Sequence, residues 1–391
     1  MKELDGSINA VNSGGWIMLK QQQMIDRAHE LMFEDIGVTS AEPFASQQAI
    51  LSERHEAYAW LESAGLDLMS GTIPQHIMPA AKSIIVLMEV YFRESYPHSL
   101  EPFFGRCYLD DDRITKDGLA RRIKAFRSFL RDNGIQSKVP FHLPHRLAAG
   151  RAGMGTFGKN CLFYSNRVAR KSSWVLPIAV VVDAEFEPGA PTLETGCPKW
   201  CRNTCMVACP TGALKGPRHI DPRRCISFLT YFGEGLTPRE LREPMGLYIY
   251  GCDRCQNVCP RNQAWLAADL PVNQRAVQKA ADFDLAKLLH MDRPYFTERI
   301  WPHMFYMPPD QIWRWKMNTA RAMGNTLDSC HIPDLVKAFE ASDDERVKSM
   351  CAWALGRIGG RRARNALNRF QKGAENRVAD EVTYALDLCG R

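Results

Sequence analysis

Eight of the chain's thirteen cysteines lie in one short block. The first group reads Cys197-x3-Cys201-x3-Cys205-x3-Cys209-Pro210, and the second reads Cys225 followed by Cys252-x2-Cys255-x3-Cys259-Pro260. A four-iron cube needs four thiolates in tetrahedral directions. A tight turn can supply three of them, and the proline then turns the chain away because it fixes φ and cannot continue a helix. Two such closures in one block predict two [4Fe–4S] clusters.

The ligands of each cluster follow from the ferredoxin pattern, in which the cysteine before the proline binds the other cluster. One predicted set is Cys197, Cys201, Cys205 and Cys259, and the other is Cys225, Cys252, Cys255 and Cys209. Cys201 is the least regular ligand, because the usual spacing is x2 where this chain has x3. Zinc also binds four thiolates, but it does not require two Cys-Pro closures with crossed ligands.

Composition limits the class of protein. The 391 residues are 45% hydrophobic and 24% charged, which is typical of a globular protein of two or three domains. No apolar run approaches the ~20 residues of a membrane span, and residues 1–15 lack the apolar region of a secretory signal. We therefore expect a cytoplasmic protein without a membrane partner, whose thiols stay reduced. The five cysteines outside the block are expected to be ordinary buried small residues: Cys107, Cys161, Cys330, Cys351 and Cys389.

Three domains are predicted from the pattern along the chain. Apolar runs at 81–91 and 174–183 predict buried strands, residues 35–40 a short strand, and 21–32 and 117–132 helices. Strands alternating with helices favour an α/β layered domain over 16–190. A Pro/Gly linker at 187–191 leads to the cluster module at 191–265, and 266–391 is Ala/Leu-rich and helical.

The C-terminal segment contains a weak internal repeat. Glu345-Arg-Val347 with Ala354-Leu-Gly356 matches Asn376-Arg-Val378 with Ala385-Leu386 at an offset of 31 residues. A period of this size indicates stacked helical pairs of the HEAT type, although a plain helical bundle with chance matches is the alternative. Basic side chains on this segment could contact nucleic-acid phosphates or form a solvated helix face: Arg357, Arg361, Arg362, Arg364, Arg369 and Lys372.

A glycine motif precedes the second long strand. It reads Gly153-x-Gly155-x-x-Gly158-Lys159-Asn160, and it permits close backbone approach to a flat ligand or a phosphate. It would equally suit a structural turn. The motif looks like a dinucleotide fingerprint, but that fingerprint follows a strand, whereas residues 145–151 are expected to be helical or irregular. NAD is therefore not expected.

Three motifs together resemble one known family. Cys209-Pro-Thr-Gly-Ala-Leu214, Tyr250-Gly-Cys-Asp-Arg-Cys-Gln-Asn-Val-Cys-Pro260 and Arg151-Ala-Gly-Met-Gly-Thr-Phe-Gly-Lys-Asn160 closely resemble epoxyqueuosine reductases. The resemblance covers most of the chain. It implies a nitroreductase-like α/β domain that binds cobalamin, a ferredoxin-like module with two [4Fe–4S] clusters, and a tail of HEAT-like repeats.

The resemblance also implies an activity. In such enzymes the clusters pass electrons from a ferredoxin- or flavodoxin-type donor to cobalt, and epoxyqueuosine in tRNA is reduced to queuosine during queuosine biosynthesis. The tRNA is then an expected partner. The implied cofactor-binding residues are Gly153, Gly155, Gly158, Lys159, Asn160, Ser173, Trp174 and Gln256.

The chain departs from the family at positions near the reaction. The family has an aspartate thirteen residues before the Ala-Gly element, where an ungapped count places Val139, and Thr156 replaces a tryptophan within the glycine motif. The stretch 107–112 replaces an Arg-Asp-Tyr-His motif. Because valine cannot donate a proton, His142, His145 and Tyr108 are the candidate donors, although each could instead pack structurally.

Three alternatives remain open at the level of sequence. The chain could be a cobalamin and iron–sulfur reductase of a different substrate. It could be an electron-transfer or corrinoid-carrying protein without a substrate pocket. It could also be a nucleic-acid-binding protein that retains its clusters for structure.

Overall fold

The computed structural model describes residues 19–63, 65–109, 118–302, 307 and 309–390. The chain divides into two compact units that alternate along the sequence. Unit 1 comprises Met1–Val90, Gly118–Cys201 and Pro260–Leu266, and unit 2 comprises Tyr91–Asp117, Arg202–Cys259 and Ala267–Arg391. The predicted three-domain division at 190 and 265 stays a prediction.

Unit 1 is built around a four-stranded sheet in the order β1-β2-β6-β3. The strands are β1 (Asp35–Ser40), β2 (Ser83–Val90), β3 (Ser137–Lys138) and β6 (Val175–Val182). Every neighbouring pair is antiparallel, and β2 pairs with β6 along its whole length from Ser83↔Val182 to Val90↔Val175. The three predicted strands are confirmed, with 35–40 matched at both ends.

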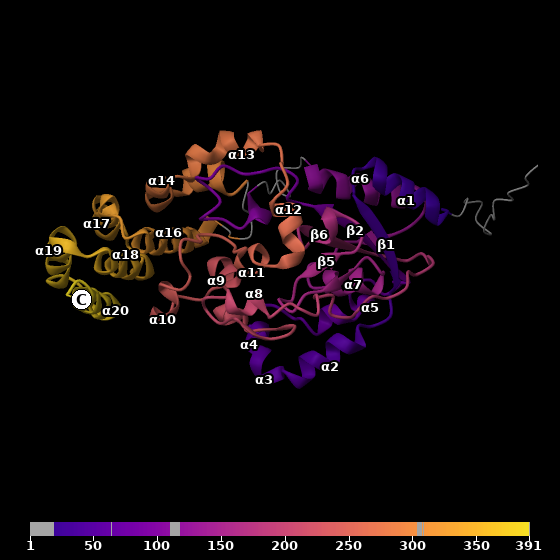
Figure 1. Ribbon diagram of the computed structural model, residues 1–391, viewed down its shortest axis with the longest axis horizontal. Helices are drawn as coiled ribbons and strands as arrows, with labels where there is room; N and C mark the ends of the chain where they lie inside the picture. The colour runs from indigo at the N-terminus through magenta and orange to yellow at the C-terminus, as the bar shows by residue number, and fades with distance from the viewer. Residues whose placement is uncertain (1–18, 64, 110–117, 303–306, 308, 391) are drawn as a thin grey trace, which may run out of the picture. The chain divides into compact units, whose positions relative to one another are not determined.

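Both faces of this sheet are buried, which explains why its long strands lack polar alternation. Ile85 and Leu87 of β2 face a core with α1 (Gln21–Glu30) and α6 (Gly118–Asp132). Ile84 and Val86 face a second core with α7 (His145–Arg151). Figure 1 shows α1 and α6 on one side of β1, β2 and β6, and α7 on the other. The predicted helices at 21–32 and 117–132 are confirmed, except that residue 117 lies outside the described residues.

The remaining elements of unit 1 are short. The hairpin β4 (Gly155–Phe157) and β5 (Phe163–Ser165) contains the glycine motif, and it pairs in register from Gly155↔Ser165 to Phe157↔Phe163. The short helices are α2 (Ala45–Glu53), α3 (His55–Tyr58), α4 (Trp60–Ser63), α5 (Pro74–Ile77) and α12 (Gln263–Leu266).

Unit 2 contains the cysteine-bearing loops and the helical tail. The first part holds α8 (Thr204–Val207), β7 (Leu214–Gly216), β8 (His219–Ile220), α9 (Ile226–Phe232), α10 (Arg239–Arg242) and α11 (Arg254–Asn257). The tail holds α13 (Gln274–Lys279), α14 (Leu285–His290), α15 (Arg293–Tyr295), α16 (Ile312–Thr326), α17 (Ile332–Ala341), α18 (Glu345–Ile358), α19 (Gly360–Gln371) and α20 (Asn376–Leu388). The predicted helical character of 266–391 is confirmed for the residues that the structure describes.

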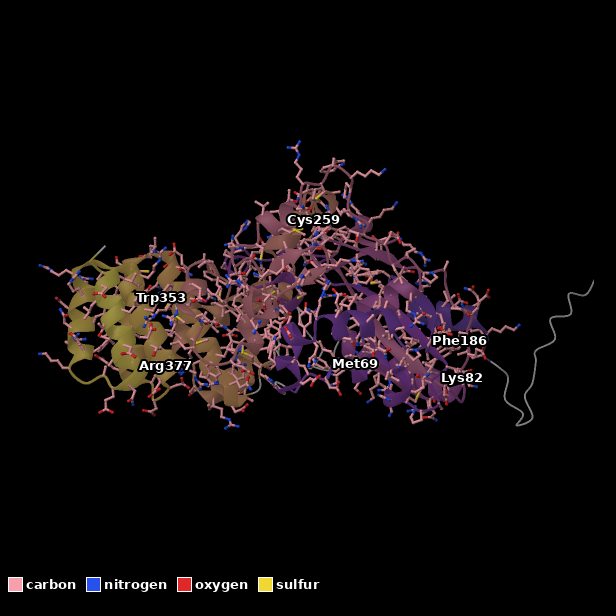
Figure 2. All side chains as sticks on the ribbon, turned by 90° about the horizontal axis from the view of Figure 1, so that it is seen from below. Met69, Lys82, Phe186, Cys259, Trp353 and Arg377 are labelled. Carbon is pink, nitrogen blue, oxygen red and sulfur yellow. The ribbon has the colours of Figure 1, made fainter. Side chains whose placement is uncertain are left out.

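The helices α16, α18 and α20 pack on one another in sequence order through small residues. A Cβ on Gly324 of α16 would lie 2.8 Å from Ala354 Cα of α18, and one on Gly356 of α18 would lie 2.7 Å from Ala385 Cα of α20. The same contact thus recurs at nearly the offset seen in the sequence. Trp353 and Arg377, labelled in Figure 2, belong to α18 and α20.

Among the described residues, every helix is too short or too polar to span a membrane.

Candidate metal centre

Two matching cysteine helices form the centre of the cysteine block in unit 2. Cys205 is the second residue of α8 and Cys255 is the second residue of α11, and each is followed four residues later by a Cys-Pro pair. The two helices contact one another, and Thr204 Oγ1 donates a hydrogen bond of 3.4 Å to the Val258 carbonyl. Cys259, labelled in Figure 2, is buried. The local repeat of the sequence therefore folds into two adjacent copies of the same turn.

The thiols of this region lie close enough to repel one another when ionised. Burial raises the pKa of Cys255 well above its ordinary value, and the charges of Cys252, Cys225 and Cys205 raise it further. Burial likewise raises the pKa of Cys252, with Cys225 contributing. Several buried thiolates at one place need a compensating cation, and a four-iron core supplies it. The donor set therefore fits a [4Fe–4S] cluster.

The described residues hold no group of three or more His, Cys, Asp or Glu side chains arranged to bind a metal ion. The crossed assignment, in which Cys209 and Cys259 exchange clusters, stays a prediction.

The first two cysteines of the block belong to unit 1. The backbone N–H of Lys159 donates to Cys197 Sγ at 3.4 Å, which ties the glycine motif to the first predicted ligand. Such a bond favours the thiolate over the thiol. Cys201 is half-buried and lies outside any helix or strand. Its role as a ligand stays a prediction.

All thirteen cysteines are thiols in the structure, and the prediction for the five outside the block is only partly right. Cys351 is buried in the core of the tail, as predicted. Cys330 is exposed, because it lies in the turn that precedes α17 on the surface. Cys107, Cys161 and Cys389 are half-buried, and Cys161 has a positive φ of 65° in the turn of the β4–β5 hairpin.

The glycine motif lies between helix α7 and strand β4. A dinucleotide fingerprint has the opposite order, with a strand before the glycines and a helix after them, so the expectation against NAD agrees with this arrangement. The groups that lie close to these glycines are backbone atoms of the protein itself. A Cβ on Gly153 would lie 2.4 Å from the Ala190 carbonyl oxygen, and one on Gly155 would lie 2.1 Å from the Tyr164 carbonyl oxygen.

The other residues predicted to bind the cofactor are also engaged within the protein. Asn160 Nδ2 donates to Tyr164 Oη at 3.0 Å, and Ser173 Oγ accepts a bond of 2.9 Å from Asn262. Trp174 is fully buried. In unit 2, Gln256 bonds Tyr91 Oη at 3.1 Å. These contacts show an internal scaffold rather than an open cradle for a corrin ring, so the cofactor-binding role of these residues stays a prediction.

Arg261 belongs to none of the predicted site residues, yet it holds several segments of unit 1 together. This side chain returns to unit 1 just after the last Cys-Pro and donates to Thr156 Oγ1 at 2.9 Å and to the Gly196 carbonyl at 3.0 Å. Its guanidinium also lies 4.5 Å from the centre of the Tyr164 ring. Thr156 therefore helps to hold the segment that precedes Cys197.

His145 has a structural environment. Its Nε2 lies 2.7 Å from the Pro140 carbonyl oxygen, and its Nδ1 lies 2.9 Å from the backbone nitrogen of Ala179. The backbone N–H must donate to Nδ1, so Nε2 carries the proton and the ring is neutral. The imidazole thereby satisfies an edge N–H of β6 beyond the end of the two-residue strand β3. Burial lowers the pKa of this histidine.

His145 should make stability fall on acidification. The unfolded chain binds a proton near pH 6.5, whereas the folded ring resists protonation, so unfolding gains a proton below that pH. The contribution of the neutral His145 ring to the free energy of unfolding is fully present above about pH 6.5 and falls by up to ~1.4 kcal/mol per pH unit below it. In the His145→Gln variant, the free energy of unfolding measured with urea should depend less on pH between pH 6.5 and 5. An unchanged slope would exclude this histidine as the source.

The segment around Val139 differs from that around His145. Val139 packs half-buried against the core shared by α1 and α6. His142 is exposed, its ring centre lies 5.2 Å from that of Phe141, and its backbone packs tightly on Gly71. The ring of His142 is thus presented to solvent by a backbone that is held in place, which suits a group that must meet a substrate.

Tyr108 belongs to unit 2, whereas His142 and His145 belong to unit 1. Its hydroxyl lies 3.3 Å from that of Tyr231, and its ring packs edge-on against Tyr250 with centres 4.9 Å apart. Gly251 is required here, since a Cβ would lie 2.5 Å from the Tyr108 ring. Tyr108 therefore supports the residues immediately before Cys252. The predicted neighbours Asp110, Asp111 and Asp112 lie outside the described residues.

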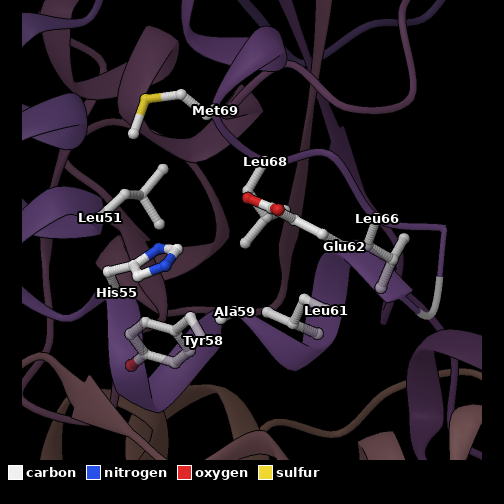
Figure 3. A pocket seen from close by; sticks show the side chains of 9 residues that line it. All are labelled: Leu51, His55, Tyr58, Ala59, Leu61, Glu62, Leu66, Leu68 and Met69. Carbon is white, nitrogen blue, oxygen red and sulfur yellow. The ribbon is translucent and has the colours of Figure 1, made fainter.

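Unit 1 also contains a pocket on its short helices, drawn in Figure 3. It is mainly aliphatic, with His55, Tyr58 and Glu62 as its polar members. Its lining residues are Leu51, His55, Tyr58, Ala59, Leu61, Glu62, Leu66, Leu68 and Met69. None of the predicted site residues is among them.

Known proteins with a similar sequence support the assignment of two [4Fe–4S] clusters to the cysteine block. The model of a 4Fe-4S double cluster binding domain matches residues 197–262. An epoxyqueuosine reductase of Bacillus cereus is 28% identical over 384 residues, covering 94% of this chain and 97% of the relative. One of Staphylococcus aureus is 29% identical over 393 residues, covering 94% and 96%.

Solved structures agree over the same length. An epoxyqueuosine reductase crystallised with an epoxyqueuosine-modified tRNA-Tyr stem loop has a TM-score of 0.81 and 25% identity, covering 95% of this chain and 99% of that one. The Bacillus subtilis enzyme, solved with its catalytic aspartate loop swung out of the active site, has a TM-score of 0.79 and 26% identity, covering 94% and 98%.

These findings define the chain as an oxidoreductase with a binding domain for two [4Fe–4S] clusters. The resemblance to epoxyqueuosine reductases is confirmed over nearly the whole chain, and the protein is an epoxyqueuosine-reductase-like enzyme.

Proposed function

We propose that this protein reduces epoxyqueuosine in tRNA to queuosine. The observation that carries the proposal is the match along 95% of the chain to a reductase solved with a modified tRNA stem loop. The net reaction takes two electrons and two protons and releases the epoxide oxygen as water. The two clusters would deliver the electrons singly from an external low-potential donor of the ferredoxin or flavodoxin type.

Cobalamin is the proposed cofactor on the strength of the resemblance. When bound, it would supply a strongly reducing metal centre for the epoxide. The predicted binding residues make hydrogen bonds and close contacts within the protein, so the steps proposed below are those of the chain's own residues. The nitroreductase-like and HEAT-like classifications and the cytoplasmic location are part of the same proposal.

His142 is the proposed proton donor among the three candidates. Both nitrogens of His145 are used inside unit 1, and Tyr108 is buried under the Cys252 loop. His142 is exposed, and its backbone is held against Gly71. A proton donor must reach the substrate, and only the exposed ring meets that requirement.

The proposed tRNA surface is α19. Arg361, Arg362 and Arg364 are exposed on this helix, whereas Arg357 is paired with Glu243 at 2.7 Å and Arg369 with Glu340 at 3.3 Å. Three exposed cations on one helix are suited to phosphate contacts.

The decisive test is anaerobic turnover of tRNA that contains epoxyqueuosine, with reconstituted protein, added cobalamin and a strong reductant. We expect queuosine as the product, about eight irons per chain, and a change in the cob(II)alamin EPR spectrum on binding. His142→Ala should lower the rate by about 10²–10⁴-fold with both clusters intact, and His145→Gln should leave it within a few-fold. Iron uptake without corrinoid binding would refute the cofactor, and no queuosine would refute the substrate.

A second candidate is a reductase of the same construction that acts on a different substrate. Val139 favours it, because an ungapped count places this residue where the family has an aspartate, and its side chain packs half-buried against the core. Under this alternative the protein would load iron and cobalamin but leave epoxyqueuosine-containing tRNA unchanged.

A further inference from the structure

Arg106 connects a segment distant in sequence to the loop that carries the last three cysteines. Its backbone N–H donates to Asp253 Oδ2 at 2.7 Å, and its guanidinium Nη1 reaches the same oxygen at 3.3 Å. Nη1 also donates to Asn257 Oδ1 at 2.7 Å. The side chains of Arg106 and Asp253 are only 13% and 5% exposed, so this ion pair is shielded from water.

Asp253 is engaged in an unusual way for its position. It is the N-cap residue of α11, where an aspartate ordinarily accepts bonds from the first helical N–H groups, yet its side chain makes no cap bond. Its carboxylate is directed to Arg106 instead. Its backbone carbonyl still begins the helix, accepting from Gln256 at 2.9 Å and Asn257 at 2.8 Å.

The backbone on either side of Arg106 strengthens the same connection. Gly105 N–H donates to the Tyr250 carbonyl at 2.8 Å, and Ile249 N–H donates to the Phe103 carbonyl at 2.7 Å. A Cβ on Gly105 would lie 3.0 Å from the nitrogen of Cys252. The residues 103–106 thus form a support along which residues 249–253 are held.

We infer that the Arg106–Asp253 pair positions the Cys252–Cys259 ligand loop and sets the reduction potential of the cluster bound by Cys252 and Cys255. Asp253 lies between these two cysteines in sequence, so its charge and that of Arg106 stand beside the cluster. Reduction adds a negative charge to the cluster, which a nearby cation favours and a nearby anion opposes. The inference rests on the assignment of clusters to this block.

The test is an EPR-monitored redox titration of the reconstituted full-length protein. Asp253→Asn removes a negative charge beside the cluster while Arg106 keeps its ion pair with Glu101 at 3.2 Å, so the cluster should reduce more easily, with the reduced-to-oxidised ratio rising about tenfold at a fixed potential, or about 59 mV for one electron. Arg106→Gln should lower that ratio, and Arg106→Lys should restore it in part. Arg239→Gln, which removes an arginine paired with Glu381 at 2.7 Å on the tail of the same unit, should not shift it.

Iron content distinguishes a failure of the cluster assignment from a failure of the role of the Arg106–Asp253 pair. Wild-type protein without iron would refute the cluster assignment itself. With both clusters loaded, an Asp253→Asn ratio that is unchanged or lower, or an Arg106→Gln ratio that is higher, would refute the role of the pair. An Arg106→Gln protein that loads one cluster while Arg106→Lys loads two would support the positioning role, and Asp253→Asn would still test the charge.

Discussion

Replacing Cys255 with serine should remove one of the two clusters and abolish measurable reduction. Serine keeps the size of the side chain but not the soft thiolate that iron requires. Cys255 lies on α11 near Cys252, Cys225 and Cys205, so the substitution removes one thiol from this set of neighbouring cysteines. Iron should fall from about eight to about four per chain, and turnover should fall by at least ~10³-fold because the electron path is interrupted.

Cys330→Ser is the matched control for this experiment. Cys330 is exposed before α17 and outside the cysteine block, so the same chemical change should leave iron content and turnover unaltered. Iron analysis, the visible absorption of the clusters and single-turnover assays measure the outcome. A Cys255→Ser protein that keeps about eight irons would show that this residue is not a ligand.

The elements that could be predicted from sequence are those specified by local patterns. The strands 35–40, 81–91 and 174–183 stood out because the sheet is buried on both faces, which makes β2 and β6 continuous apolar runs. The cysteine block could be predicted because cluster ligands follow fixed short spacings. Residues 145–151, expected to be helical or irregular, form helix α7, whereas strand β4 was not predicted.

The features that were missed depend on contacts between distant residues. Arg106 and Asp253 are separated by 147 positions, and nothing in the residues around Arg106 indicates a partner. Residues 91–109 lie between β2 and α6 of unit 1 in the sequence, yet they group with unit 2. The structural contact of the His145 ring also depends on the fold, because the ring satisfies a strand edge that only the folded sheet creates.

The helical tail allows the second large effect to be predicted. Gly356→Ala should destabilise the protein by about 2 kcal/mol, because overpacking a tight contact typically costs that much. The added Cβ would lie 2.6 Å from the Ala385 carbonyl oxygen and 2.7 Å from its Cα, so α18 and α20 would have to separate. Alanine's higher helix propensity opposes this by at most ~1 kcal/mol. The first urea transition in far-UV circular dichroism should therefore move to lower concentration.

Gly373→Ala supplies the control, because a Cβ there meets nothing within 4 Å. This substitution makes the same chemical change in the same tail and should alter stability by no more than ~0.5 kcal/mol. Gly324→Ala should behave like Gly356→Ala, since its Cβ would lie 2.8 Å from Ala354 Cα. If all three variants unfolded together with the wild type, the close helix contacts would not limit stability. A loss confined to Gly324 and Gly356 would show that the repeated small residues determine how closely successive helices stack.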